Sequence, residues 1–252
     1  MLLTAIVLQA SAAGFTPPLD VPIRVVTERR DDARIYRMER HVRFAREGLG
    51  YRAEVALRAG TGETPDSTGA GYEAGFEAFA GSTLVFHLDP QGAIVAIDDM
   101  PALWERFCRR VAEIAAARRT LAPAEREKLA ARIAAPLRAL PIERQRAMLG
   151  SLVQAVIADA AVAPGTTPVR LPGSSAYGEA TPLEGLRTVV VLPGGLVRST
   201  VRAEAADVTL ERVTDMDPRT GLIARNSRTL RIRAGGVEKV SVTLLTVDPA
   251  AE

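Results

Sequence analysis

Histidine and cysteine, the residues that most often carry nucleophilic or metal chemistry, are scarce in this chain: there are two histidines and one cysteine in 252 residues. His41 and His87 each fall on the polar or mixed face of a different predicted strand. A serine nucleophile would need one of them as its base. Ser174 and Ser175 lie in a glycine-flanked stretch, but it lacks the G-x-S-x-G spacing of a nucleophile elbow. We therefore expect a protein without catalytic activity, with a serine hydrolase as the less favoured alternative.

The sequence also predicts no metal or nucleotide site. No cysteine or carboxylate near His41 or His87 has the spacing of metal ligands. Asp98 and Asp99 are adjacent carboxylates at the start of a predicted helix, where capping of free backbone N–H groups explains them better than acid–base chemistry. The glycines of residues 69–75 do not follow G-x-G-x-x-G. Aromatic residues make up 4% of the chain and do not alternate with arginines, so neither a cofactor nor a nucleic acid is expected.

The composition is that of an ordinary globular protein, with 47% apolar and 25% charged residues. The 32 basic and 30 acidic residues nearly cancel, which argues against a polyanion-binding protein and against an acidic tail. Cys108 has no second cysteine to pair with, so stability must come from core burial. Its place among apolar residues of a predicted helix indicates a packed thiol.

The first twelve residues predict an export signal. Residues 2–8 form an uncharged apolar run that leads to Ala10-Ser11-Ala12, a small-x-small pattern that predicts cleavage after Ala12. No lysine or arginine precedes this run, so a start codon upstream of Met1 and a buried first strand are the alternatives. No other run approaches the roughly 20 apolar residues of a membrane-spanning helix. We therefore expect residues 13–252 to be soluble and periplasmic or secreted.

Alternation of apolar and polar residues predicts antiparallel strands before and after a helical block. In the run 36–44 one apolar face is interrupted by Arg40, which suggests a bulge or an open sheet edge. The run 49–57 alternates in the same way, and about five more strands are expected in 186–247. Residues 59–75 and 163–185 are rich in glycine and proline, which predicts two loops. The apolar faces consist of Tyr36, Met38, Val42 and Phe44 in the first run, and of Leu49, Tyr51, Ala53, Val55 and Leu57 in the second.

Two turns of similar sequence flank the helical block. Residues 89–92 read Asp-Pro-Gln-Gly and residues 217–221 read Asp-Pro-Arg-Thr-Gly. Proline favours the first turn position and glycine accepts a positive φ, so each predicts a hairpin turn between two strands.

Three amphipathic helices are predicted in residues 100–162. The first carries a stripe that includes Phe107, the second follows a break at 120–123, and the third begins at Pro141. The third has the broadest apolar stripe of the chain, formed by Met148, Leu149, Leu152, Val153, Val156, Ile157 and Ala160. Such a stripe is either deeply buried or meets a ligand or partner.

These elements predict an α+β fold, with a curved antiparallel sheet or half-barrel of about ten strands and the three helices packed on it. We expect a signal peptide at 1–12 and a single β-rich domain at 13–252, with a helical insertion at 100–162. The layout resembles uncharacterised bacterial exported proteins. It is more distantly similar to periplasmic lipoprotein carriers, in which a curved sheet covered by helices can hold acyl chains. The resemblance rests on residues 1–12, 36–57 and 148–160, and the contiguous helical block departs from that family's dispersed helices. It carries over no functional residue.

Two functions follow as hypotheses. The first is a non-catalytic periplasmic protein that binds an apolar ligand such as lipid between sheet and helices, with Phe107, Leu152 and Val156 lining the site. The second is an envelope protein–protein interaction module without a small-molecule ligand. In both cases no cofactor, metal or nucleic acid is expected.

Overall fold

A computed structural model describes residues 14–31, 34–58, 61–62, 75–117, 119–159, 163–172 and 182–249. The predicted signal peptide at 1–12, most of the loop 59–75, Ser174 and Ser175 lie outside these residues. No helix among the described residues is long and apolar enough to cross a membrane.

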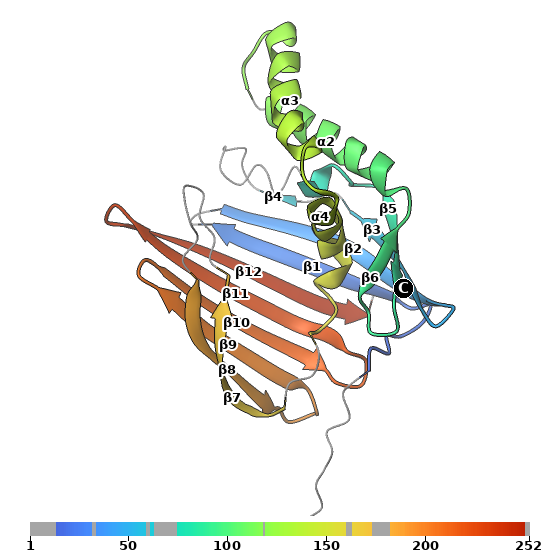
Figure 1. The fold of residues 1–252 in the computed structure, drawn as a ribbon, viewed down its shortest axis with the longest axis vertical. Helices are drawn as coiled ribbons and strands as arrows, with labels where there is room; N and C mark the ends of the chain where they lie inside the picture. Colours follow the sequence, from blue (N-terminus) through green and yellow to red (C-terminus); the bar gives the residue numbers. More distant parts are fainter. Residues whose placement is uncertain are drawn as a thin grey trace, which may run out of the picture.

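One open antiparallel sheet organises the described chain (Figure 1). Eleven strands follow the order β6-β5-β3-β2-β1-β12-β11-β10-β9-β8-β7, and β4 pairs with β2 beside this path. The predicted antiparallel sheet with helices is thus confirmed, although it has more strands than expected. The strands are β1 (Pro22–Asp31), β2 (Arg34–Glu47), β3 (Gly50–Leu57), β4 (Thr61–Gly62), β5 (Thr83–Leu88), β6 (Ile94–Ile97), β7 (Gly165–Leu171), β8 (Leu183–Val191), β9 (Val197–Ala205), β10 (Val208–Asp217), β11 (Leu222–Ala234) and β12 (Val237–Pro249).

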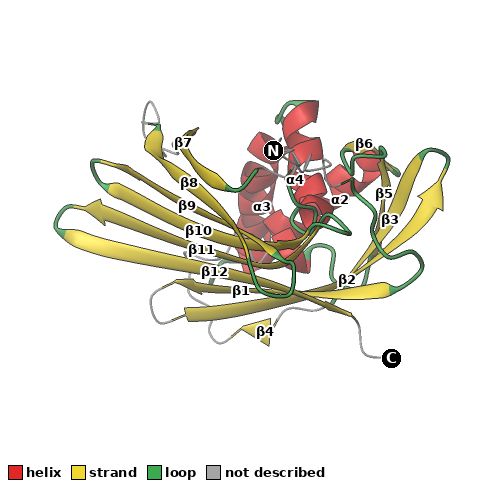
Figure 2. Cartoon of the chain, turned by 90° about the horizontal axis from the view of Figure 1, so that it is seen from below, coloured by secondary structure: helices red, strands yellow, loops and turns green. Residues whose placement is uncertain are grey.

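The first and last strands of the sequence are neighbours at the centre of the sheet. β1 pairs with β12 from Ile23 opposite Pro249 to Asp31 opposite Ser241. This pairing joins the strands before the helices to the strands after them. Figure 2 shows that the joined sheet curves around the helices, so we call the side facing them the inner face and the opposite side the outer face.

The helical block forms a projecting hairpin and a separate helix. α2 (Met100–Ala117) and α3 (Pro123–Arg138) lie side by side and extend beyond the sheet, whereas α4 (Ile142–Gln154) lies over the inner face (Figures 1 and 2). The Trp104 indole N–H donates to the Leu137 carbonyl at 3.2 Å, and Arg138 donates to Glu105 at 2.8 Å. The three predicted helices are therefore present, with α3 ending shortly after Pro136.

The chain that leaves α4 is fixed to the turn between β10 and β11. Ile223 N–H donates to the Val156 carbonyl, and Ala158 N–H donates to the Gly221 carbonyl, both at 2.9 Å. Ile157 forms an isolated antiparallel bridge with Leu222. These bonds hold the helical block to the second half of the sheet.

Phe15 contacts both of the predicted Asp-Pro turns. A Cβ atom on Gly92 would lie 3.0 Å from the Phe15 ring, and one on Gly221 would lie 3.3 Å from its Cα. Both glycines have positive φ, as the turns require. The Phe15 carbonyl also accepts a hydrogen bond from the Tyr51 hydroxyl at 2.9 Å. The segment before β1 therefore ties together two turns that are far apart in the sequence.

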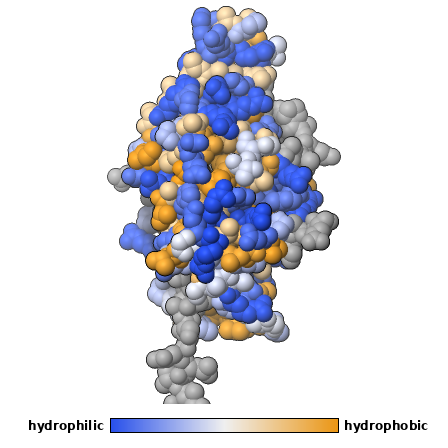
Figure 3. Space-filling view, turned by 90° about the vertical axis from the view of Figure 1, so that its right-hand side faces the viewer, coloured by the Kyte–Doolittle hydropathy of each residue, from blue (hydrophilic) through white to orange (hydrophobic). Residues whose placement is uncertain are grey.

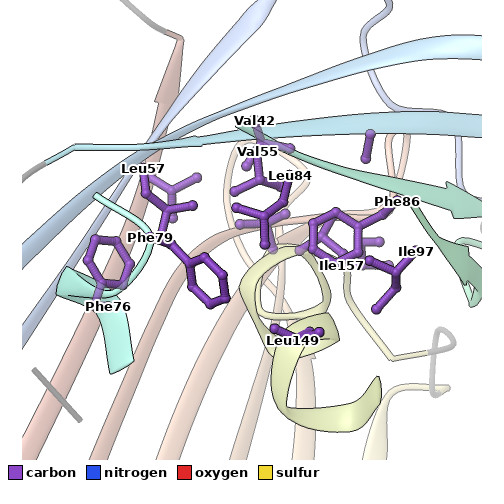
Figure 4. Close-up of a cluster of buried hydrophobic side chains, with 14 of the residues drawn as sticks. Val42, Val55, Leu57, Phe76, Phe79, Leu84, Phe86, Ile97, Leu149 and Ile157 are labelled. Carbon is purple, nitrogen blue, oxygen red and sulfur yellow. The ribbon is translucent and has the colours of Figure 1, made fainter. Parts of the chain in front are cut away.

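The main hydrophobic core lies between α4, the segment before β5 and the inner face of β2, β3 and β5 (Figure 4). Val42, Val55 and Phe86 are fully buried, and Leu149 of α4 is 2% exposed. The face shown in Figure 3 has apolar residues, in orange, in separate patches among polar ones, in blue.

Two expectations for the β regions are wrong. Residues 163–185 were expected to be a loop, but β7 lies within them and pairs with β8 along seven residues, from Gly165 to Leu171. Its alternation is hidden by Pro168 and by small polar residues, because an edge strand needs little apolar sequence. Leu49 belongs to the β2–β3 turn and is 87% exposed, rather than continuing the apolar face of β3.

Candidate functional site

A cavity of about 880 Å³ lies between the inner face of the sheet and the helices. Its apolar wall comes from α2, α4 and the segment before β5, and its floor comes from β1, β2, β10, β11 and β12. The main apolar lining side chains are Phe76, Phe79, Trp104, Phe107, Leu149 and Leu152.

Aromatic stacking fixes the position of the α2 side of this wall. The Phe107 ring stacks on Phe79 with 5.6 Å between ring centroids and on Trp104 with 5.0 Å. Such pairs add stabilisation beyond the area that they bury. A Cβ atom on Gly75 would lie 3.3 Å from the Phe107 ring, so the absence of a side chain there lets the backbone approach. Phe107 is thus a rigid part of the cavity wall.

Close packing on β6 fixes α4, which carries other side chains of the wall. A Cβ atom on Gly150 would lie 2.6 Å from Cδ1 of Ile94, so glycine at this position lets the helix approach the strand. Leu149 and Val153 are buried beside it. Leu152, at the cavity, is only half-buried.

The three residues predicted to bind the ligand do not lie together. Phe107 and Leu152 line the cavity, whereas Val156 is fully buried and is not part of the lining. The predicted third helix extended past Val156, but α4 ends at Gln154 and the chain then turns to bond with Ile223. Val156 therefore leaves the helical stripe that placed it beside Leu152. Ligand contact by Phe107 and Leu152 stays a prediction.

The cavity floor is polar. Directly opposed residues of antiparallel strands point to the same face, so the pairing register defines two rows on the inner face. The first row crosses β1, β12, β11 and β10 and consists of Thr27, Leu245, Asn226 and Thr214. The second row crosses the same strands and consists of Arg29, Thr243, Arg228 and Arg212. All eight side chains line the cavity.

Arg40 adds a buried cation to the same floor. Its side chain is only 3% exposed, and it donates to the Thr27 hydroxyl at 3.2 Å. The predicted bulge or open edge at Arg40 is wrong, because β2 pairs with both β1 and β3 here without a register shift. The arginine interrupts the apolar face because it faces a cavity rather than a packed core.

His87 lies outside the cavity and between two carboxylates. Its Nε2 is 2.7 Å from Oδ1 of Asp98, and its Nδ1 is 2.5 Å from Oε2 of Glu47. These hydrogen bonds, first to Asp98 and then to Glu47, raise the pKa of His87 above its ordinary value despite partial burial. With both ring nitrogens occupied by carboxylates, the charged imidazolium is favoured over a free general base. The Asp98 carboxylate therefore has a partner other than the helix start that the sequence suggested.

The other candidate residues, His41 and Cys108, belong to no metal-ligating group within the described chain. His41 lies 3.4 Å from Glu39 on the outer face. Burial raises the pKa of the Cys108 thiol, which makes it less reactive. Among the described residues, no group of three or more histidine, cysteine, aspartate or glutamate side chains could hold a metal ion.

Arginines at inward-facing positions of strands are the sequence feature that could have located the cavity floor. Arg40 stood out because its neighbours on that face are strongly apolar, but Arg212 and Arg228 lie in strands with mixed faces. Only the register between β10 and β11 shows that the last two are opposite each other. Comparisons with protein-family models, curated proteins and solved structures find no significant match to this chain. The candidate site therefore rests on the geometry of this chain alone.

Proposed function

We propose that this protein is an exported, non-catalytic binding protein that holds an apolar ligand such as a lipid between its curved sheet and its helices. The observation that carries the proposal is the cavity itself, about 880 Å³ in volume. Ligand sites are commonly clefts of roughly 300–1,000 Å³ with mostly apolar walls and a few polar groups. The cavity combines an aromatic and aliphatic wall with a polar floor, which suits a ligand with a long apolar part.

The fold explains why this space is not filled by the protein's own core. α4 covers the inner face of β2, β3 and β5, and the bond between Val156 and Ile223 stops the helical cover at the start of β11. Beyond that point the strands continue without a helix above them (Figure 2). A ligand in the cavity would complete the cover on this side of the sheet.

Export is the second part of the proposal, and its support is the uncharged apolar run with the Ala10-Ser11-Ala12 pattern at the start of the sequence. A cavity with an apolar wall is also suited to carrying a poorly soluble molecule through an aqueous compartment. We propose in addition that the curved sheet is a half-barrel.

Native mass spectrometry of the protein isolated from a periplasmic fraction tests both parts at once. We expect a bound mass of lipid size that dissociates on activation, and a mature chain that begins at residue 13. A full-length chain beginning at Met1 would overturn the cleavage prediction. A processed, ligand-free monomer would overturn ligand binding and would favour the alternative, an envelope protein–protein interaction module.

A further inference from the structure

The outer face shows how this chain usually places arginines on strands. Arg198 is paired with Asp215 through two hydrogen bonds of 2.7 and 2.8 Å. Arg202 donates to Glu211 at 3.0 Å. Arg231 donates to Glu238 at 3.1 Å. Each of these arginines thus has a carboxylate on a neighbouring strand, as expected for a face exposed to water.

The inner face is different. Arg212 of β10 and Arg228 of β11 are directly opposite each other, so their side chains point to the same side of the sheet at neighbouring positions. Within the described residues neither forms an ion pair. Like charges placed directly opposite each other destabilise an antiparallel pair. We call these two residues the inner arginine pair.

Other charges around the cavity do not balance this pair. Arg29, in the same row, is 2.7 Å from Asp31, and Arg40 is bonded to Thr27, so both of these arginines have protein partners. Asp159 is the single acidic residue among the described lining residues. The cavity therefore carries an excess of positive charge next to an apolar wall.

We propose that the ligand is an anionic amphiphile, whose acyl chain lies against Phe107 and Leu152 and whose carboxylate or phosphate is bound by the inner arginine pair. This inference rests on the proposed function, since it assigns the chemical class of the ligand in the same cavity. A guanidinium group presents several N–H donors in one plane and binds carboxylate or phosphate oxygens in pairs. An anion between Arg212 and Arg228 would also remove their mutual repulsion.

Matched ligands and matched variants test the proposal after the purified protein has been freed of lipid. The ligands are oleate and oleyl alcohol, which share one chain and differ in charge, measured by displacement of a fluorescent fatty-acid probe. The R212Q/R228Q variant removes the inner arginine pair. The R202Q/R231Q variant removes two outer arginines from β9 and β11, and so makes the same change in net charge.

We expect wild type to bind oleate at least about tenfold more tightly than oleyl alcohol, since hydrogen bonds to charged groups are the strong ones. R212Q/R228Q should lose this preference and keep its affinity for oleyl alcohol, while R202Q/R231Q should behave like wild type. Circular dichroism of both variants checks that they are folded. Retained binding of oleyl alcohol shows separately that the cavity of R212Q/R228Q is intact.

A second pair of ligands separates two sources of the anionic group. Dioleoyl phosphatidylglycerol and dioleoylglycerol, which share their acyl chains and differ in the phosphate headgroup, are compared in the same assay. An arginine-dependent preference for the first that exceeds the preference for oleate identifies a phospholipid headgroup rather than a free fatty acid. Equal binding of the charged and neutral members of both pairs would overturn the anionic inference and leave the proposed function standing. Absence of binding to all four ligands would overturn both.

Discussion

The two halves of the sheet, β1 to β6 before the helices and β7 to β12 after them, differ in how their inner faces are packed. On the inner face of β2, β3 and β5, side chains such as Val42, Phe44 and Phe86 are 0% exposed. The main core includes described residues from β11 and β12 but none from β7 to β10. On β11, Ile232 also points inward but is 39% exposed. One half therefore forms most of the main core. The inner face of the other half lies largely outside that core and combines buried side chains, such as Val201 and Ala203 at 1% and 3% exposure, with exposed ones.

This difference follows from where the helices enter the fold. They come directly after β6, at one edge of the sheet, and the chain returns to the other half through the bond between Val156 and Ile223. The cavity lies where this cover ends. A comparison of variants in the two halves therefore tests whether the main core lies mostly in one of them.

The largest effect is expected from removing an aromatic side chain in the main core. Phe86→Ala should lower the free energy of unfolding by about 3–5 kcal/mol, because a fully buried ring leaves a cavity that the core fills poorly. Leu230→Ala, on the inner face of β11 and outside the main core, should cost about 1 kcal/mol or less, since that side chain is only half-buried. Urea denaturation of both variants measures the difference. Equal losses would contradict the division of the sheet.

A smaller effect should separate the cavity wall from the core beside it. Leu152→Gln should lower the affinity for a fluorescent fatty-acid probe about tenfold while changing the free energy of unfolding little, because the side chain faces the cavity and is only half-buried. Val156→Ala should do the reverse and cost about 2 kcal/mol of stability, because Val156 is fully buried. Paired binding and unfolding measurements check this. A Val156→Ala variant that loses binding but not stability would return Val156 to the site.

The next prediction concerns His87, on the outer face of β5, whose charge should make the stability of the protein depend on pH. Its pKa is raised by Asp98 and Glu47, so the folded state gains stability from the charged imidazole. That gain is fully present below the ordinary histidine pKa of about 6.5 and is lost as pH rises through the raised value. Wild type should exceed His87→Gln in stability near pH 6 by less than about 1 kcal/mol, since the site is partly exposed.

Thermal unfolding of wild type and His87→Gln from acid to alkaline pH provides the measurement. If the difference in stability between wild type and His87→Gln were the same at every pH, the two carboxylates would not raise the pKa of His87.

The local features of the fold were predictable because they depend on short-range patterns. Alternation in 36–44 correctly placed Met38, Val42 and Phe44 on a buried face. The break before Pro123 correctly separated the first two helices. The neighbouring position of β1 and β12 was not predictable, because a strand's own alternation contains no information about which distant strand it pairs with.

The candidate site was only partly predictable for the same reason. Phe107 and Leu152 were found because they lie on apolar stripes of helices, which the sequence shows directly. Val156 was misplaced because the apolar stripe continues past Gln154, where the helix ends. Arg212 and Arg228 were missed because their meeting depends on the register of β10 and β11, which no pattern within either strand reveals.

The smallest expected effect is the change in the free energy of unfolding when a single arginine is removed. Its sign should differ between the inner and the outer face. Without a ligand, Arg228 faces Arg212 and should repel it, so Arg228→Gln should raise the free energy of unfolding by a few tenths of a kcal/mol. Arg202→Gln removes an exposed pair with Glu211 and should lower it by a similar amount.

Both changes should shrink as salt is added, because partly exposed charges are screened at a Debye length of about 8–10 Å near physiological ionic strength. Urea denaturation of lipid-free protein at low and high salt measures them. If Arg228→Gln destabilised the protein as Arg202→Gln does, the inner arginine pair would already be compensated by the protein itself. Opposite signs on the two faces would instead mean that the fold keeps an unfavourable charge pair on its inner face, which is expected of a site that binds an anion rather than of a surface selected for stability alone.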